Sequence, residues 1–162
     1  MESFTLKEIV IAERASLLPA IIAIWEASVR ASHDFLTDRD IAKLKPVVEK
    51  AAASVMTLVV ASTDRPVGFM GIEDHKIEML FLHPSYFRRG IGTALVRYAL
   101  ERYDVSTVDC NEQNTGALAF YKRMGFMVTG RKAIDSIGNP FPILFMRKKR
   151  RLLKAVCKMF KA

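Results

Sequence analysis

The 162-residue sequence has few of the side chains on which disulfide-linked scaffolds and metal sites depend. Its two cysteines, Cys110 and Cys157, lie far apart and form no C-x-x-C pair. Such sparse use of cysteine is typical of a reducing compartment, so we expect a cytoplasmic protein. The three histidines, His33, His75 and His83, have no metal-ligand spacing with one another or with a cysteine. We therefore expect no metal site.

Long hydrophobic runs are also missing. The longest unbroken apolar run, residues 17–25, has nine residues, which is too short to cross a bilayer as a helix. The first ten residues, MESFTLKEIV, do not place a basic region before an apolar one, so we expect no secretory signal. The length of the chain suits one domain with a substantial core.

Acidic residues are absent from the end of the sequence. Residues 147–162 contain eight lysines and arginines and no acid, whereas residues 1–146 contain seventeen basic and seventeen acidic side chains. The net charge of +8 therefore comes from the last sixteen residues alone. We divide the chain into a neutral domain, 1–146, and a basic amphipathic tail, 147–162.

The tail has two interpretations. Its apolar residues fall on one face of a short helix flanked by lysines, and they are Leu152, Leu153, Val156, Met159 and Phe160. A basic amphipathic helix can lie on an anionic membrane or contact nucleic acid. We favour the simpler interpretation, in which the apolar stripe packs on the domain or on a second copy of the chain.

Apolar periodicity and turn signals predict the order β-α-α-β-β-β-α-β-α-β-β. An amphipathic helix is expected over residues 13–31, and Thr37 should cap a second helix that Pro46 kinks or breaks. The single strand–helix–strand crossover should make strands near 77–82 and 105–110 parallel neighbours. With the other strands antiparallel, this order predicts an α+β fold with a mixed sheet.

The stretch HPSYFRRGIGTALV connects the first of these two strands to a helix through Gly90 and Gly92. A strand that enters a helix through glycines leaves unpaired N–H groups at the positive end of the helix dipole, where a phosphate can bind. Arg88 and Arg89 would add full positive charges. The same glycines also fit a tight turn without a ligand, so this stretch alone leaves both interpretations open.

Three segments, taken together and in this order, resemble the GNAT superfamily of acyl-CoA-dependent N-acetyltransferases. They are IEMLFLHPSYFRRGIGTALV, NEQNTGALAFYKRMGF and VTGRKAIDSIGNPFPIL, and the likeness covers about residues 1–146. The chain looks closest to the YjaB-type bacterial branch. The resemblance implies a twisted, mostly antiparallel sheet with one splayed parallel pair flanked by helices. It also implies transfer of an acetyl group from acetyl-CoA to a primary amine by direct attack in a ternary complex.

The family's pyrophosphate loop reads Arg/Gln-x-x-Gly-x-Gly/Ala, and here Phe87 occupies its first position. The resemblance places the pyrophosphate on the backbone of the following turn, where Arg88 or Arg89 can supply the missing charge. It places pantetheine along the strand before the turn. The cofactor residues expected on this basis are Leu80, Phe81, Leu82, Arg88, Arg89, Gly90, Ile91, Gly92, Thr93, Ala94, Asn114 and Tyr121.

Two residues carry the catalytic prediction. Tyr121 resembles the family tyrosine that donates a proton or hydrogen bond to the departing thiolate, and it follows Asn114 by the family spacing of seven residues. Asn114 could contact the cofactor, cap the helix that follows, or do both. Glu78 is the candidate general base, with a solvated surface acid as the equal alternative. His33 and His83 are the second choices for the base.

In this superfamily the first two helices and the last hairpin select the acceptor. The candidates here are Trp25, Ser28, His33, Phe35, Asp135 and Phe141. The sequence does not choose between a small-molecule and a peptide amine, and it permits a homodimer. The alternative function is an acyl-CoA-binding regulatory module whose basic tail contacts a membrane or nucleic acid.

Overall fold

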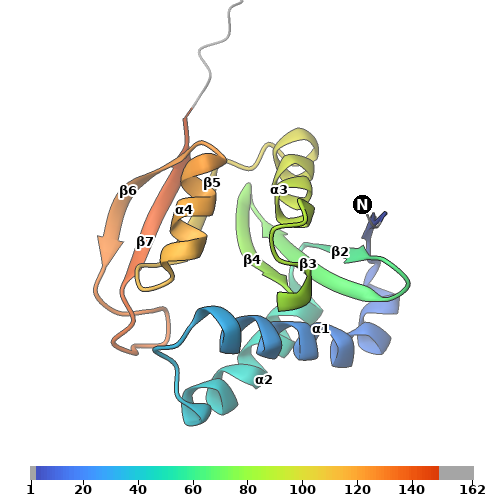
Figure 1. Ribbon diagram of the computed structural model, residues 1–162, viewed down its shortest axis with the longest axis horizontal. Coiled ribbons are helices and arrows are strands. Elements are labelled where there is room, and N and C mark those ends of the chain that lie inside the picture. The colour runs from blue at the N-terminus through green and yellow to red at the C-terminus, as the bar shows by residue number, and fades with distance from the viewer. Residues whose placement is uncertain (1–2, 150–162) are drawn as a thin grey trace, which may run out of the picture.

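The computed structural model describes residues 3–149, which form one seven-stranded sheet with helices on both faces (Figure 1). The strand order is β1-β2-β3-β4-β5-β7-β6, and every neighbouring pair is antiparallel except β4–β5. The element order agrees with the predicted one, and the α+β class is confirmed. The strands are β1 (Thr5–Glu8), β2 (Thr57–Ser62), β3 (Pro66–Glu73), β4 (Lys76–Leu82), β5 (Thr107–Asn111), β6 (Phe126–Lys132) and β7 (Ile143–Lys148).

Helices cover the two faces of the sheet in pairs, α1 with α2 and α3 with α4 (Figure 1). Alternate residues of β2 show this division. Val59 and Ala61 join the core beneath α3, whereas Leu58 and Val60 join the core beneath α1 and α2. The helices are α1 (Ile11–Ser32), α2 (Asp38–Ser54), α3 (Ile91–Arg102) and α4 (Thr115–Arg123), with a short 3-10 helix, η1 (Pro84–Tyr86), before α3.

Thr37 caps α2 as expected. Its hydroxyl accepts from the N–H of Asp40, and the Asp40 carboxylate accepts from the N–H of Thr37. The expected break at Pro46 is wrong, because α2 continues through it from Asp38 to Ser54. Pro46 is exposed, so water can reach the backbone carbonyl that its missing N–H leaves unpaired.

The parallel pair β4–β5 separates soon after it begins. The two strands pair at Lys76↔Thr107 and Ile77↔Val108, although β4 continues to Leu82 and β5 to Asn111. On its other edge β4 carries a bulge, because Gly71↔Met79 is followed by Ile72↔Ile77. Glu78 is therefore the extra residue of the bulge. The splayed pair positions the site described below.

The predicted tail lies outside the described residues except at its start. Arg147 and Lys148 form the end of β7, where Arg147 pairs with Thr107.

Candidate active site

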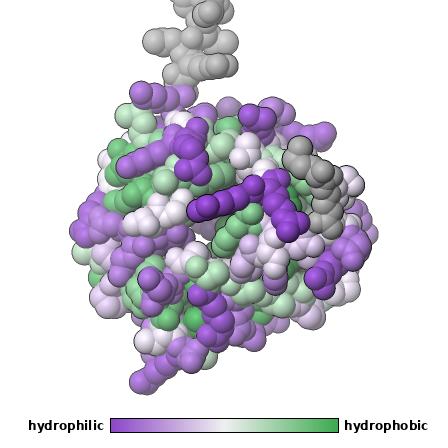
Figure 2. Space-filling model, in the orientation of Figure 1, coloured by the Kyte–Doolittle hydropathy of each residue, from purple (hydrophilic) through white to green (hydrophobic). Residues whose placement is uncertain are grey.

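A cavity of about 1060 Å³ opens where β4 and β5 separate. Its walls come from both strands, the start of α3, α4 and the end of α1. The space-filling view shows a hollow near the centre of this face, bordered by both hydrophilic and hydrophobic side chains (Figure 2). The paired residues Ile77 and Val108 belong to its lining, so the cavity begins at the point where strand pairing stops.

The turn into α3 presents backbone N–H groups to this cavity. Gly90 is the N-cap residue at φ 84°, and no side chain of the described residues caps the helix. The first N–H groups of α3 therefore have no partner within the helix and lie at its positive end. A Cβ on Gly90 would meet nothing within 4 Å, so the left-handed dihedral, rather than space, favours glycine. This is the local geometry that an anion site requires.

The structure separates the predicted cofactor residues into two groups. Arg89, Ile91 and Ala94 do not line the cavity: the Arg89 guanidinium lies over the Tyr86 ring at 5.0 Å, and Ile91 is buried in the core. Phe87, at the position that departs from the family pattern, lines the cavity and is 38% exposed. The predicted residues that do line it are Leu80, Phe81, Leu82, Arg88, Gly90, Gly92, Thr93, Asn114 and Tyr121.

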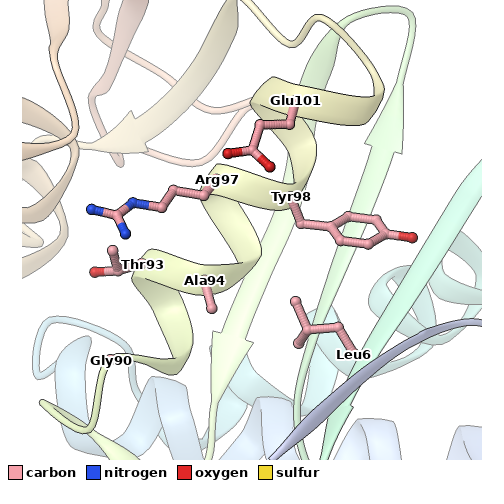
Figure 3. A pocket seen from close by; sticks show the side chains of 7 residues that line it. All are labelled: Leu6, Gly90, Thr93, Ala94, Arg97, Tyr98 and Glu101. Carbon is pink, nitrogen blue, oxygen red and sulfur yellow. The ribbon is translucent and has the colours of Figure 1, made fainter.

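A second, shallower groove of about 500 Å³ runs along α3. Gly90 and Thr93 line both the groove and the cavity, so the two meet at the turn. Arg97 points to the same side of α3 as Thr93, whereas Leu6 and Tyr98 lie on the other side (Figure 3). Arg97 therefore places a positive charge one helical turn after Thr93, on the same side of α3.

Tyr121 extends from α4 into the splayed gap. Its side chain is 7% exposed, and its ring lies 5.2 Å from that of Phe120 and 5.9 Å from that of Phe126. Burial raises the pKa of Tyr121 above its ordinary value of 10.0, and the nearby Cys110 adds to the shift. The hydroxyl therefore keeps its proton in neutral solution and can act as a donor.

Glu78 lines the cavity together with Asp109 of β5. Lys76 holds both carboxylates, with its Nζ 2.8 Å from Asp109 Oδ2 and 3.1 Å from Glu78 Oε1. Burial works against the charged form of Lys76, but the hydrogen bonds to Asp109 and Glu78 outweigh it, so the pKa of Lys76 is raised. The cluster carries two negative charges and one positive charge, which leaves a net negative charge beside the cavity.

Asn114 caps α4 and also borders the cavity. Its Oδ1 accepts from the N–H of Ala117 and caps α4, and its side chain also lines the cavity. Its Nδ2 lies 3.5 Å from Nε2 of His33 at the end of α1. His83, the other histidine considered as a base, accepts from the N–H of Ser85 and caps η1 instead.

The predicted acceptor residues do not form one group. Ser28 and His33 line the cavity. The rings of His33 and Phe35 lie 5.3 Å apart, and those of Phe35 and Phe141 lie 5.5 Å apart, so the α1–α2 turn meets the β6–β7 loop. Phe35 packs against His33 and Phe141 against Phe35, but neither phenylalanine lines the cavity itself.

Trp25 and Asp135 lie elsewhere, and their assignment to the acceptor site needs correction. Trp25 is 2% exposed in the core between α1 and the sheet, because it belongs to the apolar stripe of the helix. Asp135 organises its own turn by accepting from the N–H groups of Ile137 and Asn139 and from the Asn139 amide. Neither residue lines the cavity.

Several lining residues were missed by the sequence-based list. They include Asp34, Cys110, Phe120 and Arg123. Burial raises the pKa of Cys110 to about 11, so this thiol is neutral and poorly nucleophilic. Phe120 and Arg123 lie on the same helix as Tyr121, but one residue before it and two after it, so helical spacing from Tyr121 gave no signal for them.

Among residues 3–149 no group of three or more histidine, cysteine, aspartate or glutamate side chains is arranged to hold a metal ion. No helix in the same part of the chain combines the length and the apolar character needed to cross a membrane.

Comparison with known proteins gives a consistent set of matches. A protein-family model described as "Acetyltransferase (GNAT) domain" matches residues 54–128. The peptidyl-lysine N-acetyltransferase YjaB of Salmonella typhimurium is 42% identical over 125 residues, which are 76% of this chain and 86% of that protein.

Solved structures agree with this result. The solution structure of apo-form YjaB from Escherichia coli matches with a TM-score of 0.80 and 34% identity, over 91% of this chain and 98% of that one. A second match is yncA, a putative acetyltransferase from Salmonella typhimurium solved with its cofactor acetyl-CoA. It covers 90% of this chain and 92% of that one, with a TM-score of 0.60 and 17% identity, and so supports the fold alone.

Proposed function

Because the chain belongs to the GNAT family of N-acetyltransferases, we propose that it acetylates the side-chain amine of a lysine in a peptide or protein, with acetyl-CoA as the donor. The observation that carries the proposal is the single cavity in the splayed β4–β5 gap. It joins an anion-binding turn, a buried tyrosine and a carboxylate pair. The name of the YjaB relative supports the choice of lysine as acceptor.

The turn at the start of α3 would hold the pyrophosphate of acetyl-CoA. The free N–H groups of the first turn of α3 and the Arg88 side chain face the cavity there. The backbone of Leu80 to Leu82, which β5 does not pair, would hold the pantetheine amides. Bound acetyl-CoA supplies the activated thioester.

In the part of the cavity away from the turn at the start of α3, charge favours a cationic acceptor. Asp34, Glu78 and Asp109 line it, and the cations Lys76 and Arg123 offset two of these three charges. A lysine ammonium group would be attracted to the carboxylates and would then have to lose its proton before it can react. Glu78, the extra residue of the bulge, lines the cavity, and in this proposal it accepts that proton directly or through water.

The reaction balances with two residues of the chain. Glu78 takes one proton from the ammonium group, and the neutral amine forms a bond to the thioester carbonyl carbon as the carbon–sulfur bond breaks. Tyr121 donates a hydrogen bond to the departing thiolate sulfur. The nitrogen then gives up a second proton, which passes through water to the thiolate sulfur. The proton held by Glu78 returns to solvent, and the products are an amide and coenzyme A in its thiol form. No acyl-enzyme is needed, which agrees with the neutral, buried thiol of Cys110.

Initial rates of thiol release with acetyl-CoA test the proposal. The acceptors are an N-terminally blocked lysine peptide, the same peptide with arginine in place of lysine, and a panel of small amines. We expect turnover with the lysine peptide and intersecting double-reciprocal plots, the pattern of a ternary complex. Turnover confined to small amines would refute the acceptor, and parallel plots would refute direct attack.

A further inference from the structure

His33 and Asn114 connect two parts of the molecule that the splayed sheet holds apart. His33 ends α1, and Asn114 begins α4, whose last turns carry Tyr121. The two residues are 81 positions apart in the sequence, yet Asn114 Nδ2 lies 3.5 Å from His33 Nε2. Both side chains line the cavity, so the contact spans it from the α1 side to the α4 side.

The hydrogen bonds of His33 define which of its ring nitrogens carries the proton. The Ser32 hydroxyl donates its hydrogen to the Ser28 carbonyl at 2.7 Å, so it can only accept from the ring at 2.8 Å. Nδ1 of His33 must therefore be the N–H donor to Ser32. Nε2 is left with a lone pair, which accepts a hydrogen bond from Asn114 Nδ2.

The environment of His33 favours the neutral ring. Burial lowers the pKa of His33 below its ordinary value of 6.5, while the carboxylate of Asp34 on the same turn works in the opposite direction. A protonated ring would direct an N–H of Nε2 at the amide NH₂ of Asn114, so two donors would face each other. The polar side chain that meets the ring from α4 is Asn114 itself, which is uncharged.

The amide of Asn114 is held in one orientation from both sides. Its Oδ1 accepts from the Ala117 N–H at 3.0 Å, and its Nδ2 donates to His33. Exchange of the two amide atoms would place the NH₂ against the Ala117 N–H and the carbonyl against the lone pair of Nε2. Both bonds would be lost, and one amide N–H remains in the present orientation for a ligand in the cavity.

We infer that His33 is a positioning residue for the acetyl-CoA site, because its neutral ring links α1 to the cap of α4 and fixes the amide of Asn114 for the cofactor. Its Nε2 is engaged by Asn114, so His33 is not the base for the acceptor amine. The inference rests on the proposed function in taking acetyl-CoA as the ligand of the cavity.

A double-mutant cycle on the affinity for acetyl-CoA tests the link. His33→Phe keeps a ring beside Phe35 and removes the acceptor. Asn114→Ser keeps a helix-capping oxygen and replaces the amide NH₂ with a shorter side chain. Each change should raise the calorimetric Kd for acetyl-CoA about three- to tenfold. The double variant should be no weaker than the weaker single variant. Additive losses would overturn the inference.

Rescue and control variants separate positioning from a general loss of structure. His33→Gln restores an acceptor near the place of Nε2 and should return the Kd to within about twofold of the wild-type value. Phe35→Leu removes the tilted ring beside His33 but leaves the hydrogen bonds, and should not change the Kd. If Phe35→Leu weakens binding as much as His33→Phe, packing rather than the hydrogen bond is responsible and the inference fails.

A measurement without cofactor distinguishes failure of the inference from failure of the proposed function. The ¹⁵N shifts of the His33 ring in the free protein should show the Nδ1–H tautomer, with Nε2 changed by Asn114→Ser. The Nε2–H tautomer would overturn the inference even if acetyl-CoA binds normally. Wild-type protein that shows the expected tautomer but does not bind acetyl-CoA would refute the proposed function and, with it, the cofactor role of His33.

Discussion

Replacement of Tyr121 with phenylalanine isolates the step in which the thiolate leaves. The hydroxyl forms no hydrogen bond with another side chain of residues 3–149 that its loss would leave unpaired, and the ring contacts with Phe120 and Phe126 remain. The free energy of unfolding should therefore change little. Any loss of turnover can then be assigned to the hydroxyl rather than to the fold.

The expected size of the loss follows from acidity. Burial raises the pKa of Tyr121 above 10.0, whereas a thiol has a pKa of about 8.5. Full transfer of the proton from the tyrosine to the thiolate is therefore unfavourable, and the hydroxyl acts as a hydrogen-bond donor to developing negative charge. Such charge-assisted bonds contribute about 1.5–3 kcal/mol, so kcat should fall about 10- to 150-fold, and not by the larger factors of general acid catalysis.

Steady-state turnover and calorimetry with acetyl-CoA measure the two effects separately. We expect the kcat of Tyr121→Phe to fall while its Kd for acetyl-CoA stays near that of the wild type. Tyr103→Phe is the matched control, because its hydroxyl interacts with Glu8 and the residue does not line the cavity. That variant should lose stability and keep its kcat. A Tyr121→Phe enzyme with wild-type turnover would refute the assignment.

Further outcomes follow from the turn, the core and the pH dependence. Arg88→Ala should raise the KM for acetyl-CoA about tenfold, because Arg88 lines the cavity. Arg89→Ala should raise it much less, because Arg89 does not line the cavity and lies over the Tyr86 ring. Equal effects of the two substitutions in steady-state assays would contradict this. Gly90→Ala should cost about 1–2 kcal/mol of unfolding free energy, measured in urea, because φ is 84° there. Arg14 is 3% exposed and donates to the backbone carbonyls of residues 9, 53, 55 and 56. Arg14→Met should therefore lower the free energy of unfolding by at least about 3 kcal/mol. A loss near zero would show that water satisfies these carbonyls in place of the arginine. Because the pKa of His33 is lowered in the folded state, the unfolded state binds more protons as pH falls below 6.5. The wild-type protein should therefore lose stability relative to His33→Gln as the pH falls. Parallel curves of unfolding free energy against pH for the two proteins would contradict this.

Local motifs were the part of the site that could be predicted from the sequence. Gly90 and Gly92 determine a turn within a few residues, and the spacing of Asn114 and Tyr121 places both on one side of a single helix. The element order also followed from apolar patterns and turn signals. Strands show either alternation, as in β5, or a continuous apolar run between turns, as in β3. These features depend on short stretches of chain.

The features of the site that the sequence did not predict depend on contacts between segments that are distant in the chain. Lys76 holds Glu78 and Asp109 because β4 and β5 are neighbours for two residue pairs, and the bulge that places Glu78 arises from its register with β3. The link between His33 and Asn114 requires the end of α1 to reach the start of α4. Trp25 shows the same limit, because an aromatic residue on an apolar stripe gives no signal of which neighbour covers it.

Mass spectrometry of an N-terminally blocked lysine peptide after incubation with the enzyme and acetyl-CoA tests the central claim most directly. We predict one added acetyl group, located by fragmentation on the lysine side chain and formed much more slowly by Tyr121→Phe. The matched peptide with arginine in place of lysine should remain unmodified. An unmodified lysine peptide alongside rapid acetylation of a free N-terminus or a small amine would contradict the account.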